Sequence, residues 1–473
     1  MPIRSYQMYE NPGIRVEAED TPVLSPSTVV PPVLVALVGK TANRRSYTEV
    51  VQLENEDEVR LSRLGIDLDL ITVENRFTGE AYSVGDDFDI TQEEDDDGYY
   101  ETYISRIEEG EIPDGEFVTV SYEYRDPDFL EPRRVADYDD IRDAYGRPFD
   151  DEGEIYSELS LAARLFFQNG PSEVYAVPVD DKEGDADQLD AWEDALDRLA
   201  DIEDVDVVVP ISGNEAVHDK VELHVNSASN NRNRHRRAIL GRDGTTGAVS
   251  RDDLVQKANV YSNQRLSLID PTKFKILNDR TDEDMNVGAQ YAAAAIAGRM
   301  ASQDVQEPLT RKSISGFRKV GESRTESDML SSQRNGLMVV WQKRNGQIIV
   351  RHGLTTDTTN IFNQELSVMM GRDRLTNLFE NMLDQQGLIG SPITENTPET
   401  VVGGVTGVLE EAVEDGLIYS YDGVKFRIPS SRPTVIQVKF QYQPTMPLNY
   451  VEVSFAIDTQ SGTLEFDDGE LTA

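Results

Sequence analysis

Helical and strand patterns alternate along the chain from about residue 130. Residues 157–169 carry apolar side chains at helical spacing, and Gly170 follows where such a helix would end. The next apolar run, 174–179, is short and rich in valine, which indicates a strand. The alternation continues with helices at 188–201, 214–227 and 289–302 and strands at 205–211, 237–241 and 266–270. This alternation predicts a mostly parallel sheet with helices on both faces.

The amino-terminal part of the chain supplies one further strand and an arm. Residues 32–39 form a continuous apolar run, which is typical of a strand buried on both faces. We therefore predict an α/β core domain that comprises residues 25–44 and 130–345. Residues 1–24 contain three prolines and no helical periodicity, and their apolar positions alternate over 13–18. They are interpreted as an extended amino-terminal arm.

Residues 45–129 interrupt this core with a different pattern. Apolar and polar positions alternate at 70–73 and 117–122, turn signals occur at Thr78-Gly79 and Asp114-Gly115, and no helical pattern is present. We predict an inserted all-β domain. It holds 26 acidic and 6 basic residues, a net charge of −20.

A second mixed unit is predicted at 346–458, followed by an acidic tail at 459–473. Its elements are a strand at 347–351, a long helix at about 361–386, a second helix at about 398–415 and alternating strands at 434–442 and 450–457. The predicted fold class is therefore multidomain, α/β and α+β, with extended arms at both ends.

Charge sets this chain apart from an average globular protein. Asp and Glu number 88 against 45 Lys and Arg, so the net charge is −43, and only 11 of the basic residues are lysine. Such self-repulsion is costly at low salt and is screened in molar salt, which favours a halophilic host. Phosphate binding needs clustered cations, so no nucleic-acid partner is expected.

Neither a membrane segment nor thiol chemistry is expected. The first ten residues lack the apolar region of a signal peptide, and the most apolar stretch, 29–39, is too short to span a bilayer. A soluble protein made in a cytoplasm is predicted. The absence of cysteine excludes disulfides, thiolate metal sites and cysteine catalysis.

Catalytic and nucleotide-binding motifs are incomplete. The Val38-Gly39-Lys40-Thr41 run lacks the glycine that a phosphate-binding loop needs five residues earlier, and the glycines of 241–247 have the wrong spacing for a dinucleotide fingerprint. His218 and His224 are six residues apart, which does not suit a helical zinc site, and no nucleophile elbow occurs. We expect no enzyme activity, cofactor or metal.

One basic cluster stands out in this acidic chain. It consists of Arg232, Arg234, Arg236 and Arg237 and has no interleaved aromatic residues. We interpret it as complementing an acidic neighbour or the carboxyl end of the preceding helix.

The order of these segments resembles contractile tail sheath proteins of tailed viruses. The resemblance is carried by the Asn11-Pro12-Gly13 strand before the run ending at Gly39, by 155–180, by 224–241, by the alanine helix and proline loop of 292–317, and by 347–457. It implies a subunit of stacked hexameric rings around a tail tube, assembled in the host cytoplasm into a virion tail, with tube, baseplate and tail terminator proteins as partners.

The resemblance also implies which residues make contacts between subunits. Arms would exchange strands through Gly13, Ile14, Arg15, Val16 and Glu17 at one end and Val451, Glu452, Val453, Ser454 and Phe455 at the other. Arg372 and Arg374 of the carboxyl-terminal domain would face an acidic tube, and the inserted domain would lie outside. A cellular contractile injection system, an α/β enzyme with a β insertion and a non-contractile surface protein stay open as alternatives.

Overall fold

The centre of the protein is an eight-stranded sheet. The computed structural model describes residues 33–41, 45–55, 57–94, 100–124, 128–170, 173–182, 184–232, 234–247, 249–449, 451, 456–457 and 464–465. The sheet has the order β18-β17-β13-β12-β11-β1-β10-β9, and its six inner strands are parallel. The two edge strands run antiparallel to their neighbours. The strands are β1 (Val35–Lys40), β9 (Arg133–Val135), β10 (Val174–Val179), β11 (Val207–Pro210), β12 (Arg237–Leu240), β13 (Leu266–Asp270), β17 (Leu337–Gln342) and β18 (Ile348–Val350).

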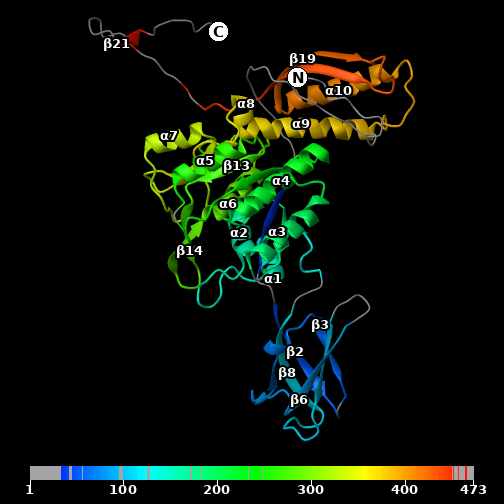
Figure 1. Cartoon of the computed structure of the whole chain (residues 1–473), viewed down its shortest axis with the longest axis vertical. Coiled ribbons are helices and arrows are strands. Elements are labelled where there is room, and N and C mark those ends of the chain that lie inside the picture. The colour runs from blue at the N-terminus through cyan, green and yellow to red at the C-terminus, as the bar shows by residue number, and fades with distance from the viewer. Residues whose placement is uncertain are drawn as a thin grey trace.

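Helices cover both faces of this sheet (Figure 1). One apolar cluster unites side chains of α1 (Tyr138–Tyr145), α2 (Glu158–Phe167) and α6 (Ala289–Ala301) with one face. A second cluster unites α3 (Asp185–Ala200), α4 (Glu215–Asn231) and α5 (Arg251–Tyr261) with the other. The helices α2 and α6 pack so closely that only glycine fits at position 298. A Cβ atom on Gly298 would lie 2.2 Å from the carbonyl oxygen of Phe166.

Smaller elements flank the core. A three-stranded sheet consists of β14 (Lys273–Asn278), β15 (Glu283–Gly288) and β16 (Lys319–Val320), and α7 (Glu326–Arg334) lies beside β17. The sequence patterns did not predict these elements, nor β9, α1, α5 and β17. Short strands and polar helices give too weak a periodicity to stand out from loops.

Residues 45–124 form a β-sandwich with its own apolar cluster. One sheet has the order β2-β8-β4-β5 and the other the order β3-β7-β6. Val118, Val120 and Ile104 are completely buried between them. The elements are β2 (Arg45–Leu53), β3 (Val59–Leu64), a 3-10 helix (Leu68–Leu70), β4 (Thr72–Asn75), β5 (Ala81–Tyr82), β6 (Phe88–Glu94), β7 (Tyr100–Arg106) and β8 (Glu116–Tyr124).

The carboxyl-terminal domain consists of helices and a hairpin around a fourth apolar cluster. Its helices are α8 (Ile361–Gln364), α9 (Leu366–Gln385) and α10 (Thr397–Glu414), and its hairpin pairs β19 (Ile418–Arg427) with β20 (Gln437–Pro444). The single helix predicted at 361–386 is thus interrupted at Glu365, whose backbone is extended. The strand predicted at 347–351 belongs to the core sheet as β18, because it pairs with β17. The helix and strand predicted at 398–415 and 434–442 correspond to α10 and β20.

The two outlying domains lie at opposite ends of the core (Figure 1). The inserted domain leaves the core after Lys40, at the carboxyl end of β1. The helix α9 lies across the opposite end of the sheet, at the amino ends of its parallel strands. Leu34, Asp206 and Arg237 stand there, at the amino ends of β1, β11 and β12. Near the chain's end, β21 (Ala456–Ile457) pairs with β22 (Leu464–Glu465). No described helix is long and apolar enough to cross a membrane.

We expect the inserted domain to be dispensable for folding, because its apolar cluster is separate from those of the core. Replacing residues 45–124 with a short Gly-Ser linker, which keeps Phe129 of the core cluster, should leave a soluble protein with a single cooperative thermal transition, and assembly should persist. Circular dichroism and electron microscopy measure these two outcomes. Loss of the core's helical signal would contradict the separation of the two units.

Candidate assembly site at the junction of the core and the carboxyl-terminal domain

A buried ion-pair network joins the core to α9. The Nη2 of Arg237 donates to Oδ2 of Asp373 at 2.5 Å, and Nη1 of Arg265 donates to the same oxygen at 3.1 Å. Arg237 also donates to the Met369 carbonyl at 2.7 Å and to the Gln264 carbonyl at 2.8 Å. All three charged side chains are buried. The network therefore ties the amino ends of β12 and β13 to one face of α9.

Electrostatics keep this network charged. Burial alone would raise the pKa of Asp373, but Arg237 and Arg265 hold that pKa well below its usual range. Burial lowers the pKa of Arg237 to about 10, which leaves it protonated at neutral pH. A buried carboxylate between two guanidinium groups fixes an orientation, because any displacement of α9 would leave a charge unpaired in the interior.

The rest of the basic cluster caps a helix. Arg232 donates to the carbonyl of Ala200 at 3.0 Å and Arg236 to that of Leu199 at 3.0 Å, while Arg234 donates to Glu203 at 2.7 Å. These groups stand at the carboxyl end of α3, where the helix dipole favours cations. Both predicted roles occur, because Arg234 has Glu203 as an acidic neighbour and the cluster caps a helix. The capped helix is α3, however, and not α4, which directly precedes the cluster in sequence.

The histidines near the cluster are neutral structural groups. Arg236 donates to Nε2 of His224 at 2.8 Å, and burial together with the charge of Arg236 lowers the pKa of His224 to about 3. Nε2 of His218 lies 2.8 Å from the Ser212 carbonyl oxygen, and burial lowers the pKa of that histidine to about 4. Within the described part of the chain, no group of three or more His, Cys, Asp or Glu side chains is arranged to hold a metal.

Both ends of the folded body are anchored at the same junction. The amide of Leu34, near the start of the first described segment, donates to Oδ2 of Asp206 at 2.9 Å. Asn449 accepts from Thr310 at 3.1 Å and donates to Glu365 at 2.9 Å. Leu34 and Asn449, near the two ends of the main described body, are therefore held next to α9.

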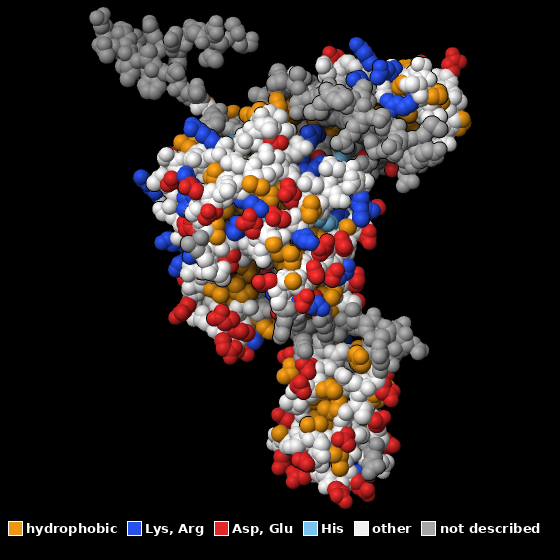
Figure 2. Space-filling model, in the orientation of Figure 1, with side chains coloured by type: hydrophobic (Ala, Val, Ile, Leu, Met, Phe, Trp, Pro, Cys, Tyr) orange, Lys and Arg blue, Asp and Glu red, His pale blue; other side chains and the backbone are white. Residues whose placement is uncertain are grey.

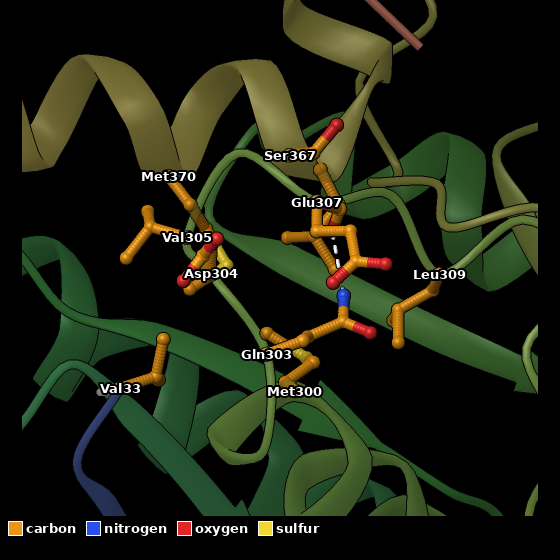
Figure 3. A pocket seen from close by; sticks show the side chains of 10 residues that line it. Val33, Met300, Gln303, Asp304, Val305, Glu307, Leu309, Ser367 and Met370 are labelled. Carbon is orange, nitrogen blue, oxygen red and sulfur yellow. Dashed lines mark hydrogen bonds between the residues drawn. The ribbon is translucent and has the colours of Figure 1, made fainter. Parts of the chain in front are cut away.

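Two small clefts open beneath α9. The first encloses about 260 Å³, including space open to solvent, between the start of α9 and the loop after α6 (Figure 3). Gln303 crosses its floor and donates to the Glu307 carbonyl at 2.6 Å. The second encloses about 320 Å³ and is lined by Val33, Asp206, His235, Arg237, Val305, Met370, Asp373 and Arg374.

Most of the predicted arm residues fall outside the described part of the chain. These are Gly13, Ile14, Arg15, Val16, Glu17, Glu452, Val453, Ser454 and Phe455. Val451 is described and is 72% exposed. Arg374 lines the second cleft, and Arg372 lies close enough to Asp373 and Arg237 to influence both charges. Their predicted contact with a tube stays a prediction.

The hairpin of the carboxyl-terminal domain presents a basic face. Val438 and Phe440 pack into the apolar cluster, so the alternating residues of β20, including Lys439, point away from it. Lys439 stands directly opposite Lys425, and Arg427 follows on the same side. Like charges in a cross-strand pair are unfavourable in isolation. This face is therefore suited to an anionic partner.

Sequence reasoning missed the central residues of the junction. Asp373 and Arg265 attracted no attention. Arg237 was expected to complement an acidic neighbour or the carboxyl end of the preceding helix, and its acidic neighbour is Asp373. A signal existed in Arg372-Asp373-Arg374, where one acid lies between two arginines on an otherwise amphipathic helix. Pairing across 136 residues cannot be read from such a local pattern.

The arrangement of the domains is shared with contractile sheaths. The chain superposes on the helical sheath of the anti-feeding prophage in its contracted state with a TM-score of 0.57 at 12% identity, covering 94% of this chain and 99% of that one. It also superposes on the PVC sheath complex of an extracellular contractile injection system in its contracted state, with a TM-score of 0.53 at 13% identity, covering 70% and 87%. The fold is therefore that of a contractile sheath protein.

Sequence relatives narrow this class to a family. The tail sheath protein of Mycobacterium phage Bxz1 is 34% identical over 411 residues, which are 85% of this chain and 70% of the relative. The tail sheath protein of Bacillus phage SP01 is 26% identical over 288 residues, which are 58% of this chain and 47% of the relative. No known family profile matches the chain. The chain belongs to the tail sheath protein family, whose members are structural subunits of a contractile tail and not enzymes.

We expect Asp373→Asn to lower the free energy of unfolding by about 3–5 kcal/mol, because it leaves two buried guanidinium groups without a counter-charge. Asp384→Asn removes the same charge from an exposed position of the same helix and should change it by less than about 0.5 kcal/mol. Urea denaturation of both variants measures the difference. Equal stability of the two variants would show that the network does not hold α9.

We expect His224 to make the protein less stable in acid. The pKa of His224 is lower in the folded than in the unfolded state, so the unfolded state alone binds its proton between about pH 6.5 and pH 3. Its contribution to stability is complete above that window and decreases as the pH falls. Between pH 7 and pH 4.5 the wild type should lose about 2 kcal/mol more than His224→Gln. Between pH 7 and pH 8 the two should show the same pH dependence, and parallel behaviour down to pH 4.5 would contradict the assignment.

Proposed function

We propose that this chain polymerises as stacked hexameric rings around a tail tube and contracts to drive that tube through the host envelope during genome delivery. The observation that carries the proposal is the family relationship. The positions of Leu34 and Asn449 at one junction, from which both proposed arms would extend, support it. Relatives of the fold include a sheath and a baseplate of the anti-feeding prophage. Contacts with a tube, a baseplate and a tail terminator are part of the proposal.

Strand exchange is the proposed link between subunits. In the described residues β19 and β20 pair only with each other, so each has one edge with unpaired backbone groups. An extended segment can satisfy such groups by adding a strand. The arms that contain Gly13 to Glu17 and Val451 to Phe455 are the proposed donors, acting on neighbouring copies. A head-to-tail contact of this kind produces a helical tube.

The polarity of the molecule supports an orientation in the tube wall. The carboxyl-terminal domain would lie inside, and the inserted domain would lie at the outer surface, where its net charge of −20 meets solvent. In Figure 2, acidic side chains lie along the sides and the lower end of that domain, around hydrophobic side chains in the middle of its visible face. The basic face of the hairpin, with Lys425, Arg427 and Lys439, is proposed as a second tube contact, in addition to Arg372 and Arg374.

Contraction is proposed to release a metastable assembly. The extended state would persist because of a kinetic barrier, and subunits would then move as nearly rigid bodies. The buried network around Asp373 supports rigid movement, since it ties the two domains of each subunit together. No nucleotide hydrolysis is required for this mechanism.

The alternatives differ in the support they have. The two structural relatives favour a cellular contractile injection system. Capsid genes beside the coding gene would indicate a viral tail, and effector genes would indicate an injection system. For an α/β enzyme, the described residues offer no assembled catalytic site in support. Assembly in the cytoplasm of a halophilic archaeon is a proposal that rests on the net charge of −43 alone.

We expect deletion of residues 1–20 or of residues 459–473 to leave soluble, folded monomers that do not form tubes, because the core and its clusters lie outside both segments. Negative-stain electron microscopy and sedimentation measure assembly, and striated hollow tubes are expected from the full chain and not from either truncation. The variant without residues 45–124 loses more residues but should still form tubes, so it serves as the control. Normal tubes from both truncations would contradict the strand-exchange proposal.

A further inference from the structure

A group of cations without counter-charges lies at one edge of the core. Lys275 of β14 stands directly opposite Lys319 of β16, and like charges in such a cross-strand pair are unfavourable. The turn between β17 and β18 joins this group, because the side-chain amide of Gln342 donates to the carbonyls of Arg318 at 3.4 Å and Gly346 at 3.0 Å. We call this group the basic edge. It consists of Lys273, Lys275, Arg318, Lys319, Lys343 and Arg344.

The basic edge is unusual in so acidic a chain. It holds four of the 11 lysines, although the net charge of the chain is −43. Among the described residues, none of its side chains makes an ion pair, and Lys343 donates to the neutral side chain of Gln347 at 3.3 Å. Acids nearby include Asp284, on the same face of the small sheet, and Glu322, which is paired with Arg324. An excess of like charges repels itself unless an anionic partner offsets it.

The opposite side of the core carries the complementary charge. The exposed face of α3 holds Asp185, Asp187, Asp190, Glu193, Asp194 and Asp197. Glu193 is paired with Lys220, whose charge also reaches Asp190 and Asp197, and the five aspartates make no ion pair within the described part of the chain. The helix α3 packs beside β10 near one edge of the large sheet, whereas β17 and β18 form its other edge. The helix α3 and the strand β14 accordingly lie on opposite sides of the core (Figure 1).

Both surfaces lie at a similar level along the molecule. Lys273 comes soon after the carboxyl end of β13, Lys343 directly follows that of β17, and α3 begins shortly after that of β10. These strands are parallel, so the three ends point the same way, toward the inserted domain. With the carboxyl-terminal domain inside the tube wall and the inserted domain outside, this level corresponds to one radius. A copy rotated about the tube axis would therefore present its acidic surface to the basic edge of its neighbour.

We propose that the basic edge of one copy binds the acidic face of α3 on a neighbouring copy. The inference rests on the proposed assembly and adds a contact between core domains that is separate from strand exchange. The partner is a second copy because this chain itself supplies the complementary acids at the matching level. The contact is head-to-tail, since the two surfaces differ, and such a contact can continue around a ring. Charge complementarity of this kind determines which surfaces meet and in which register.

Charge reversal tests the contact. Lys319→Glu/Arg344→Glu reverses part of the basic edge, and Asp187→Lys/Asp194→Lys reverses part of the face of α3. All four side chains are exposed, so circular dichroism should show that the monomers stay folded. Each double variant should raise the critical concentration for tube assembly about tenfold, as measured by sedimentation, because attraction is replaced by repulsion.

A control and a rescue separate a lost contact from a general effect of charge. Arg76→Glu/Arg334→Glu makes the same change of net charge as the first variant, at exposed positions outside the basic edge, and should assemble like the wild type. A chain that carries all four reversals should recover a critical concentration within about threefold of the wild type, because each reversed surface again meets its complement.

The remaining outcomes decide against the contact or isolate it from the proposed function. If both reversed variants assemble like the control, or if the chain with all four reversals does not recover, the two surfaces do not meet and the proposal is overturned. Should Lys319→Glu/Arg344→Glu fail to fold, Lys319→Gln/Arg344→Gln takes its place, with an expected increase of about threefold. If the wild type forms no tubes, the proposed assembly fails. Sedimentation equilibrium of the monomers then judges the contact: self-association that both reversals abolish supports it, and the absence of self-association overturns it.

Discussion

The shared carboxylate of Asp373 is the constraint on which the arrangement of this molecule depends. Arg237 and Arg265 stand at the amino ends of neighbouring parallel strands, so one acid on α9 fixes the carboxyl-terminal domain against that edge. A buried ion pair contributes little net stability compared with apolar packing, because desolvation offsets its attraction. What it does contribute is a single permitted orientation. For a sheath subunit, which assembles with copies of itself, a fixed orientation of the two domains keeps its surfaces in register with its neighbours.

The parallel sheet explains why the two outlying domains lie at opposite ends. All strands of its inner part point the same way, so its amino and carboxyl edges are chemically distinct surfaces. The carboxyl-terminal domain packs against the amino ends of the strands, where the Asp373 network holds it. The inserted domain leaves the core from the carboxyl end of β1. The acidic insertion is thereby kept away from the basic face of the hairpin. In the proposed assembly this separation would limit repulsion between copies and leave the net charge of −20 in contact with solvent.

Much of the fold followed from local patterns, and the parts that did not follow share a cause. The buried strands β1, β10, β11 and β13 and the helices α2 and α6 have strong periodicity, and their predicted positions match the structure to within a few residues. The sheet β14-β15-β16, the strand β19 and the helix α5 have weak or mixed periodicity and were not predicted. The strand β18 was predicted but assigned to the wrong unit, because a pattern of three apolar residues does not show which sheet it joins.

The sequence by itself determined the class of the protein, since the order of segments, the absence of catalytic motifs and the charge distribution are all properties of the linear chain. It also determined where apolar cores form, because periodicity marks the face that each element buries. Only the tertiary structure decided which charges meet. Arg237 and Asp373 are 136 residues apart, and Leu34 and Asp206 are separated by 172. Pairing over such separations depends on which edges and helix ends the packed cores bring together, and no local pattern records that.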